Sequence, residues 1–169
     1  MQRTKSHSAL LAKRNGEHFE RLIEITCAYY SKMGVALIQK TPEPMRVLKD
    51  LGRGQFKAVF TKKAQPDFTG TLKSGKSVVF EAKHTDGTNI PFSRINEEQE
   101  RDLKIHDHLG AISFVLISFN MKNFYAVPFQ EWMQLKEQSG KKSVNQTDLV
   151  DYQISTEKGY LNFIREVEL

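Results

Sequence analysis

The sequence predicts an α/β domain in which a central sheet is flanked by helices and a basic segment projects from the core. Apolar residues recur at helical spacing in some segments and in strand-like runs in others. A segment rich in Pro and Gly interrupts this pattern over residues 41–65. A length of 169 residues is the usual size of one domain, so we expect residues 1–169 to form a single unit.

The first helix is predicted over residues 16–33. Its apolar residues recur at helical spacing, at Phe19, Ile23, Cys27 and Tyr30. Gly34 offers a natural C-terminal stop. Residues 1–14 are polar and basic without periodicity, so we expect a flexible basic arm. Cys27, the only cysteine, lies on the apolar side of the helix and is predicted to be a buried structural thiol.

A short strand is predicted over residues 35–39, directly before the projecting segment. Pro42 and Pro44 exclude a helix there and disfavour a central strand, so the chain leaves the core. Residues 41–65 are therefore predicted to form a stalk-like excursion. This excursion carries a group of basic residues, namely Lys49, Arg53, Lys57, Lys62 and Lys63.

The rest of the chain predicts a β-hairpin, a helix, two strands and a helix. They are expected over residues 67–83, 96–109, 111–119, 123–127 and 129–138. A Lys-Ser-Gly-Lys turn at 73–76 separates the two strands of the hairpin. The run over 111–119 is almost wholly apolar, which is typical of a strand covered on both faces of a sheet.

Basic charge is concentrated in the N-terminal part of the chain. The net charge is +5, and residues 1–65 carry 13 Lys or Arg against 5 Asp or Glu, whereas residues 66–169 carry 12 against 15. Lysine and arginine gain affinity for nucleic acid by releasing its condensed counterions. The asymmetry favours a nucleic-acid partner, and a basic tail without a partner is the alternative.

Membrane and disulfide-based classes have no support in the sequence. No stretch reaches the roughly 20 apolar residues that span a bilayer, and the N-terminus lacks the apolar run of a secretory signal. A single cysteine excludes a disulfide within the chain and a cysteine-based zinc site. We expect a cytoplasmic protein without a membrane partner.

The residues that carry chemistry are Asp67 and two residues of the following strand, Glu81 and Lys83. Alternate residues of a strand share a face, so Glu81 and Lys83 point the same way while Phe80 and Ala82 point the other way. The hairpin brings Asp67 close to Glu81. Adjacent carboxylates repel unless a proton or a hard cation lies between them, and such oxygen ligands suit Mg²⁺ or Mn²⁺. An ordinary salt bridge between Glu81 and Lys83 is the alternative.

The same residues fit a known pattern. Pro66-Asp67, thirteen intervening residues and Glu81-Ala-Lys83 resemble the PD-(D/E)XK nuclease motif. Nearly the whole chain also resembles the RecU-type Holliday junction resolvases. The segments that carry this second resemblance are Phe19-Glu20, Gln39-Lys-Thr-Pro-Glu-Pro, Asp67-Phe-Thr-Gly, Phe80-Glu-Ala-Lys-His-Thr, Pro91-Phe, Gln99, Ile112-Ser-Phe-Val-Leu-Ile and Gly140-Lys-Lys-Ser.

The resemblance implies a restriction-endonuclease-like core with a mixed sheet, and a homodimer that cuts four-way DNA junctions with Mg²⁺, for which Mn²⁺ can substitute. Asp67, Glu81 and Lys83 match the catalytic positions of the family. Glu20 and Gln99 match two further active-site positions. The excursion corresponds to the family's stalk, which enters the junction. The residues expected to contact DNA are Lys40, Arg53, Lys57, Lys62 and Lys63.

We therefore predict a Holliday junction resolvase that makes paired symmetric nicks in recombination and repair. Asp67, Glu81 and Gln99 would hold Mg²⁺, Lys83 would assist at the transition state, and Glu20 would position metal or water. One alternative is an endonuclease of the same superfamily that acts on ordinary duplex. The other is a non-catalytic protein that binds branched DNA, although such a binder gains nothing from buried negative charge that faces phosphate.

Overall fold

The central sheet is six-stranded and mixed, with the strand order β1-β4-β5-β7-β8-β10. The computed structural model describes residues 3–61, 65–138, 140–157 and 159–164. The strands of the sheet are β1 (Ala36–Lys40), β4 (Phe68–Leu72), β5 (Ser77–Thr85), β7 (Ile112–Phe119), β8 (Asn123–Pro128) and β10 (Gln153–Ile154). β5 and β7 are parallel, and every other neighbouring pair is antiparallel.

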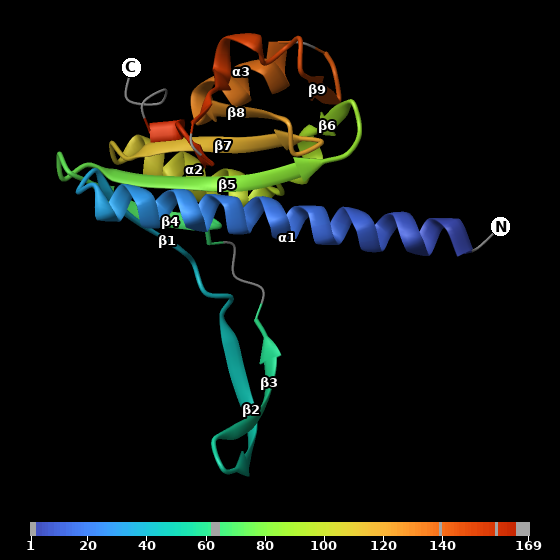
Figure 1. The fold of residues 1–169 in the computed structure, drawn as a ribbon, viewed down its shortest axis with the longest axis vertical. Coiled ribbons are helices and arrows are strands. Elements are labelled where there is room, and N and C mark those ends of the chain that lie inside the picture. Colours follow the sequence, from blue (N-terminus) through green and yellow to red (C-terminus); the bar gives the residue numbers. More distant parts are fainter. Residues whose placement is uncertain (1–2, 62–64, 139, 158, 165–169) are drawn as a thin grey trace.

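Helices cover both faces of this sheet (Figure 1). α1 (Arg3–Lys32) packs on one face, where Phe19 and Ile23 join a core with Phe68, Phe80 and other sheet residues. α2 (Glu97–His108) and α3 (Phe129–Gln138) pack on the other face through residues that include Leu103 and Trp132. The predicted α/β fold, a mixed central sheet flanked by helices, is confirmed.

Strand β7 lies between two cores, as its apolar run predicted. Seven of its eight residues are buried, and consecutive residues contribute to opposite cores, Phe114 and Leu116 to the first and Val115 and Ile117 to the second. This alternation follows from the period-2 geometry of a strand. β7 thereby fixes the position of its parallel neighbour β5, which carries Glu81.

The residues predicted as a flexible arm are helical from Arg3 onward, so the prediction of an irregular arm over residues 1–14 is wrong for this segment. The segment is rich in Ala, Leu, Lys and Arg, which are strong helix formers, and Gly16 does not interrupt the helix. The N-terminal part of α1 extends past the edge of the sheet (Figure 1). At its other end the helix stops before Gly34, which adopts a φ of 66°.

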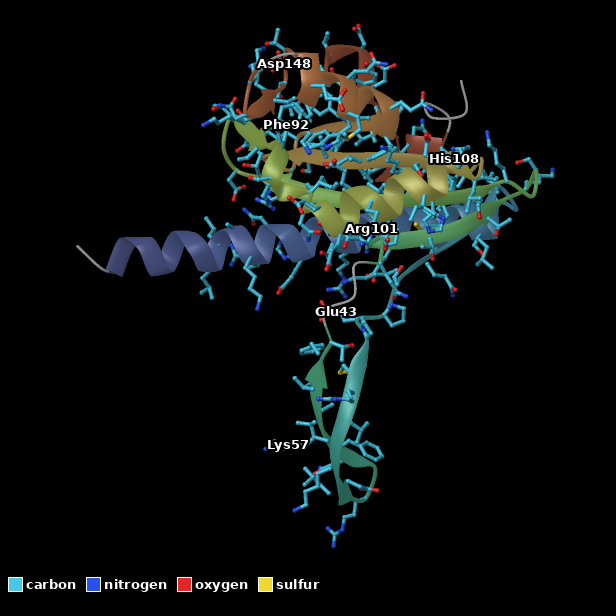
Figure 2. All side chains as sticks on the ribbon, turned by 180° about the vertical axis from the view of Figure 1, so that it is seen from behind. Glu43, Lys57, Phe92, Arg101, His108 and Asp148 are labelled. Carbon is cyan, nitrogen blue, oxygen red and sulfur yellow. The ribbon has the colours of Figure 1, made fainter. Side chains whose placement is uncertain are left out.

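The excursion over residues 41–65 projects from the domain, as predicted, but it is a regular β-hairpin (Figure 1). Its strands are β2 (Met45–Gly52) and β3 (Gln55–Phe60), and every residue of both strands is exposed. Because neither face is buried, the sequence lacks the alternation of apolar and polar residues that reveals most strands. Figure 2 shows Glu43 at the base of the hairpin and Lys57 further out along it.

Short elements that the sequence did not predict complete the fold. β6 (Asn89–Pro91) pairs with β9 (Ser143–Asn145), and β11 (Thr156–Glu157) pairs with β12 (Tyr160–Leu161). Two 3-10 turns, η1 (Phe92–Arg94) and η2 (Val150–Tyr152), precede α2 and β10. No helix within the described residues combines the length and apolarity that crossing a membrane requires.

Candidate active site

Strand pairing brings Asp67 opposite Glu81. β4 and β5 pair antiparallel with Phe68 opposite Phe80, so Asp67, one residue before β4, reaches the level of Glu81 on β5. Phe80 belongs to the core beneath α1, and alternation turns Glu81 and Lys83 toward the face that α2 covers. The predicted grouping of Asp67, Glu81 and Lys83 is present in the structure.

Lys83 links the two carboxylates. Its Nζ donates to Glu81 Oε2 at 2.7 Å and lies 3.3 Å from Asp67 Oδ2. The backbone N–H of Ala82 also donates to Asp67 Oδ2, at 2.9 Å, which fixes the orientation of this carboxylate. The side chain of Lys83 is only 10% exposed and that of Glu81 is fully buried. A salt bridge between Glu81 and Lys83 therefore exists, but it belongs to a larger buried cluster.

Gln99 joins the cluster from the first turn of α2. Its Nε2 donates to Glu81 Oε2 at 2.5 Å. Its Oε1 accepts from the backbone N–H of Asn96, and the Asn96 side chain accepts from the backbone N–H of Gln99, so the two residues form a capping box. In this arrangement Gln99 contributes a donor to Glu81, while its oxygen serves the helix cap. Its predicted role as a metal ligand stays a prediction.

Burial makes the negative charge of Glu81 costly. Desolvation raises the pKa of Glu81 to about 8, the ammonium of Lys83 opposes this rise, and the charge of Asp67 adds to it. Glu81 Oε1 is buried and has no hydrogen-bond partner among the described residues. A buried acceptor of this kind, beside a second carboxylate, fits a hard divalent cation. The described residues contain no group of three His, Cys, Asp or Glu side chains arranged for a metal. The two carboxylates that Lys83 links are those of Asp67 and Glu81.

Glu20, the fourth predicted catalytic residue, pairs with Lys40. Glu20 Oε2 lies 2.6 Å from Lys40 Nζ, and this hydrogen bond is the main cause of a raised pKa for Lys40. The negative charges of Glu24 and Asp67 raise the pKa of Lys40 further. Lys40 thus lies within electrostatic reach of both Glu20 on α1 and Asp67 of the cluster.

Two cavities flank these residues. The first, of about 690 Å³, lies between the base of the hairpin and the start of α2, and it is lined by Pro44, Phe60, Asp67 and Gln99 among others. The second, of about 630 Å³, is lined by residues of α1 and β5 that include Glu20 and His84. The Asp67 carboxylate is 30% exposed, so a ligand in the first cavity can reach the cluster.

The hairpin presents basic residues along one face. Arg46 lies opposite Val59 and Lys49 lies opposite Lys57, and this register places the three basic side chains on the same face. Arg53, also a predicted DNA contact, occupies the turn between the strands with a φ of 55°. Arg46 was not predicted. Regular alternation would place it and Lys49, three residues apart, on opposite faces, and the register shift between Val47 and Lys49 brings them to one face. The predicted contacts Lys62 and Lys63 lie outside the described residues.

The sequence matches one known family through most of its length. The sequence model described as Recombination protein U, RecU, matches residues 14–168. The protein named Holliday junction resolvase RecU from Pediococcus pentosaceus is 30% identical, and the alignment covers 78% of this chain and 70% of that protein. The protein of the same name from Staphylococcus carnosus is 29% identical over 99% of this chain and 88% of that protein.

A solved structure gives a weaker likeness. The Hjc Holliday junction resolvase of Archaeoglobus fulgidus aligns with 79% of this chain and 91% of that chain at a TM-score of 0.49 and 14% identity. At this level the match carries no inference about function. The match to the sequence model spans nearly all of the described fold, from within α1 to beyond β12, and includes Asp67, Glu81, Lys83 and Gln99. This chain belongs to the Recombination protein U (RecU) family.

Proposed function

We propose that this chain is a Holliday junction resolvase, an endonuclease that makes paired symmetric nicks in four-way DNA junctions during recombination and repair. Its membership of the RecU family and the names of its relatives, Holliday junction resolvases, support this substrate. The observation that carries the proposal is the cluster of Asp67, Glu81 and Lys83 beside an open cavity at the base of a basic hairpin.

Asp67 and Glu81 would hold a divalent cation, for which we propose Mg²⁺, with Mn²⁺ able to substitute. The unpartnered Oε1 of Glu81 and the partly exposed carboxylate of Asp67 support this assignment. When bound, the ion would supply a Lewis acid that activates water and neutralises phosphate charge. Gln99 would hold Glu81 in place, and rotation of its amide would offer an oxygen as the third predicted ligand.

Lys83 and Glu20 would act on the phosphate and the attacking water. The Lys83 ammonium already lies between two carboxylates, and it would stabilise the charge that develops on the attacked phosphate. Glu20 would help to position metal or water from the side of α1. Its ion pair with Lys40, which also lies within electrostatic reach of Asp67, holds Glu20 in place without burying it, since the Glu20 side chain is 37% exposed.

A homodimer would supply the two active sites that paired nicks require. A two-fold dimer matches the two-fold symmetry of a junction, so the substrate would be chosen by shape and backbone contacts more than by base sequence. The expected contacts with DNA are Lys40, Arg53, Lys57, Lys62 and Lys63. The exposed basic face of the hairpin supports this interpretation because phosphate contacts need accessible cations.

The decisive experiment compares substrates and one substitution. Purified protein and its Asp67→Ala variant are incubated with a labelled four-way junction and a matched linear duplex, with Mg²⁺ or with EDTA. Paired nicks in the junction alone, lost with EDTA or with Asp67→Ala, are expected. The control variant, Asp151→Ala, lacks an exposed carboxylate outside the cluster and should cut the junction at the wild-type rate.

Two other outcomes would overturn the proposal. Equal cutting of junction and linear duplex would identify a duplex endonuclease of the same superfamily. Tight junction binding without cleavage, in Mg²⁺ as well as in Mn²⁺, would identify a branched-DNA-binding protein that has the fold but not the reaction. Sedimentation of the purified protein tests the homodimer separately.

A further inference from the structure

His84 follows Lys83 on β5, and its ring is held by hydrogen bonds on both sides. Nδ1 lies 3.1 Å from Ser118 Oγ on β7, and Nε2 lies 3.1 Å from Asp86 Oδ1. The side chain is only 4% exposed and packs against Phe19 of α1, with 6.3 Å between the ring centroids. The hairpin was predicted to end at residue 83, but β5 continues to Thr85 and places His84 in the sheet.

Asp86 extends this contact to α1. Both of its carboxylate oxygens lie 3.0 Å from the side-chain nitrogen of Asn15, which is 71 residues earlier in the chain. Arg94 also holds His84, because its guanidinium donates to the backbone oxygen of His84 at 3.4 Å. A continuous polar connection therefore runs from α1 through Asp86 and His84 to β7.

The connection joins the two elements that bring catalytic residues together. Lys83 is the neighbour of His84 on β5, and Glu20 lies five residues after Asn15 on α1. His84 and Glu20 line the same cavity of about 630 Å³. Because a helix is stiff over a few turns, fixing α1 at Asn15 also fixes the position of Glu20 relative to the end of β5.

We propose that Asn15, Asp86 and His84 form a polar latch that positions the active site. The latch holds α1 against the end of β5 and thereby sets the distance between Glu20 and the pair Glu81 and Lys83. Its three members are positioning residues, since their described contacts are with one another and with Ser118, Phe19 and Arg94. The catalytic part of this inference rests on the proposed nuclease function.

The test uses Asn15→Ala, which breaks the link to α1 and leaves β5 untouched. Alanine is a stronger helix former than asparagine, so the variant should fold. Its kcat for cleavage of a four-way junction with Mg²⁺ should fall about 10-fold, the lower end of the loss that follows removal of a direct partner of a metal ligand, because Asn15 acts through Asp86. KM should stay within about threefold of the wild-type value, because the latch does not contact DNA in this assignment.

A second variant and a control make the test specific. Asp86→Ala should lower kcat as much as Asn15→Ala, and the double variant should lose no more than either single one, since both remove the same link. His18→Ala changes an exposed residue on the same helix and should cut at the wild-type rate. Backbone hydrogen exchange around residues 15–20 should be faster in Asn15→Ala than in the wild type and unchanged in His18→Ala.

The outcomes separate this inference from the proposed function. If the wild-type protein cuts the junction and Asn15→Ala cuts it with the same kcat, the latch is overturned. Additive losses of kcat in the double variant would overturn it as well. A wild-type protein that does not cut would overturn the nuclease function instead. Hydrogen exchange then decides the latch alone, because unchanged exchange in α1 of Asn15→Ala would refute it.

Discussion

Gln99 donates a hydrogen bond of 2.5 Å to Glu81 and, at the same time, closes the N-terminal cap of α2 with Asn96. One side chain therefore fixes both the start of a helix and a carboxylate of the candidate active site. The geometry ties the placement of Glu81 to the cap, because Gln99 can reach both partners only when the first turn of α2 is formed.

Replacing Gln99 should impair cleavage more than the loss of the cap explains. Asn96→Ala removes the N-cap acceptor and should cost about 1 kcal/mol of unfolding free energy. Gln99→Ala should cost a similar amount and, in addition, lower the cleavage rate about 10- to 100-fold, because Glu81 loses one of its two donors and keeps only Lys83. Urea unfolding and single-turnover cleavage of both variants give the comparison. Equal cleavage rates in the two variants would contradict this coupling.

The stability of the metal-free protein should fall as the pH rises toward 8. Burial raises the pKa of Glu81 to about 8 in the folded state, above the value of about 4.3 expected for an unfolded chain. The folded state therefore binds this proton more tightly. The corresponding stability is fully present below pH of about 4.3 and is lost as the pH rises through about 8.

Glu81→Gln isolates this contribution because glutamine does not ionise. Between pH 5 and 8, the wild-type free energy of unfolding should fall relative to that of the variant by at most about 1.4 kcal/mol per pH unit. Urea unfolding of both proteins in EDTA at several pH values measures the difference. Parallel curves would show that Glu81 titrates normally. The same variant should not cleave DNA. Glu81 would then be a residue that activity requires although its buried negative charge lowers the stability of the fold.

Gly70 lies where β4 and β1 approach too closely for a side chain. A Cβ at this position would lie 2.2 Å from the backbone oxygen of Leu37 and 2.6 Å from Ile38 Cα. Gly70→Ala should therefore destabilise the fold by about 1–3 kcal/mol, because the obstacle is backbone and cannot rotate away. Gly16→Ala is the matched control, since a Cβ at this position would meet nothing within 4 Å. This substitution should stabilise α1 by about 0.5–1 kcal/mol, because glycine is the less favourable residue inside a helix. Chemical denaturation measures the free energy of unfolding of each variant. A value for Gly70→Ala at or above that of the wild type would contradict the strand geometry.

The sequence was most informative where local rules decide the structure. Asp67, Glu81 and Lys83 could be grouped because strand alternation and a short turn determine which side chains meet. α3 was predicted with its observed bounds, Phe129–Gln138, because Pro128 and helical spacing mark them. Cys27 was predicted to be buried and is 4% exposed, and burial raises the pKa of its thiol to about 12.

Contacts between distant segments could not be predicted in the same way. The hydrogen bond between Asn15 and Asp86 joins positions 71 residues apart, and no local spacing relates them. The ion pair of Glu20 with Lys40 depends on how α1 lies across β1, which the packing of the whole core decides. The hairpin of β2 and β3 escaped prediction because strand patterns reflect burial, and this hairpin buries neither face.

The basic face of the hairpin should contribute a salt-dependent part of junction binding. Lys57 lies opposite Lys49 and is exposed, so a phosphate contact would release counterions from the DNA. Lys57→Ala should weaken binding of the junction and reduce the slope of log K against log salt by about 1. Binding is measured in EDTA over a series of salt concentrations, so that cleavage does not interfere. Lys122→Ala, which removes an exposed lysine between β7 and β8, should leave the slope unchanged. If Lys57→Ala and Lys122→Ala shared the wild-type slope, the hairpin would not contact phosphate at this position, and the basic charge of the N-terminal part would have to act through other residues.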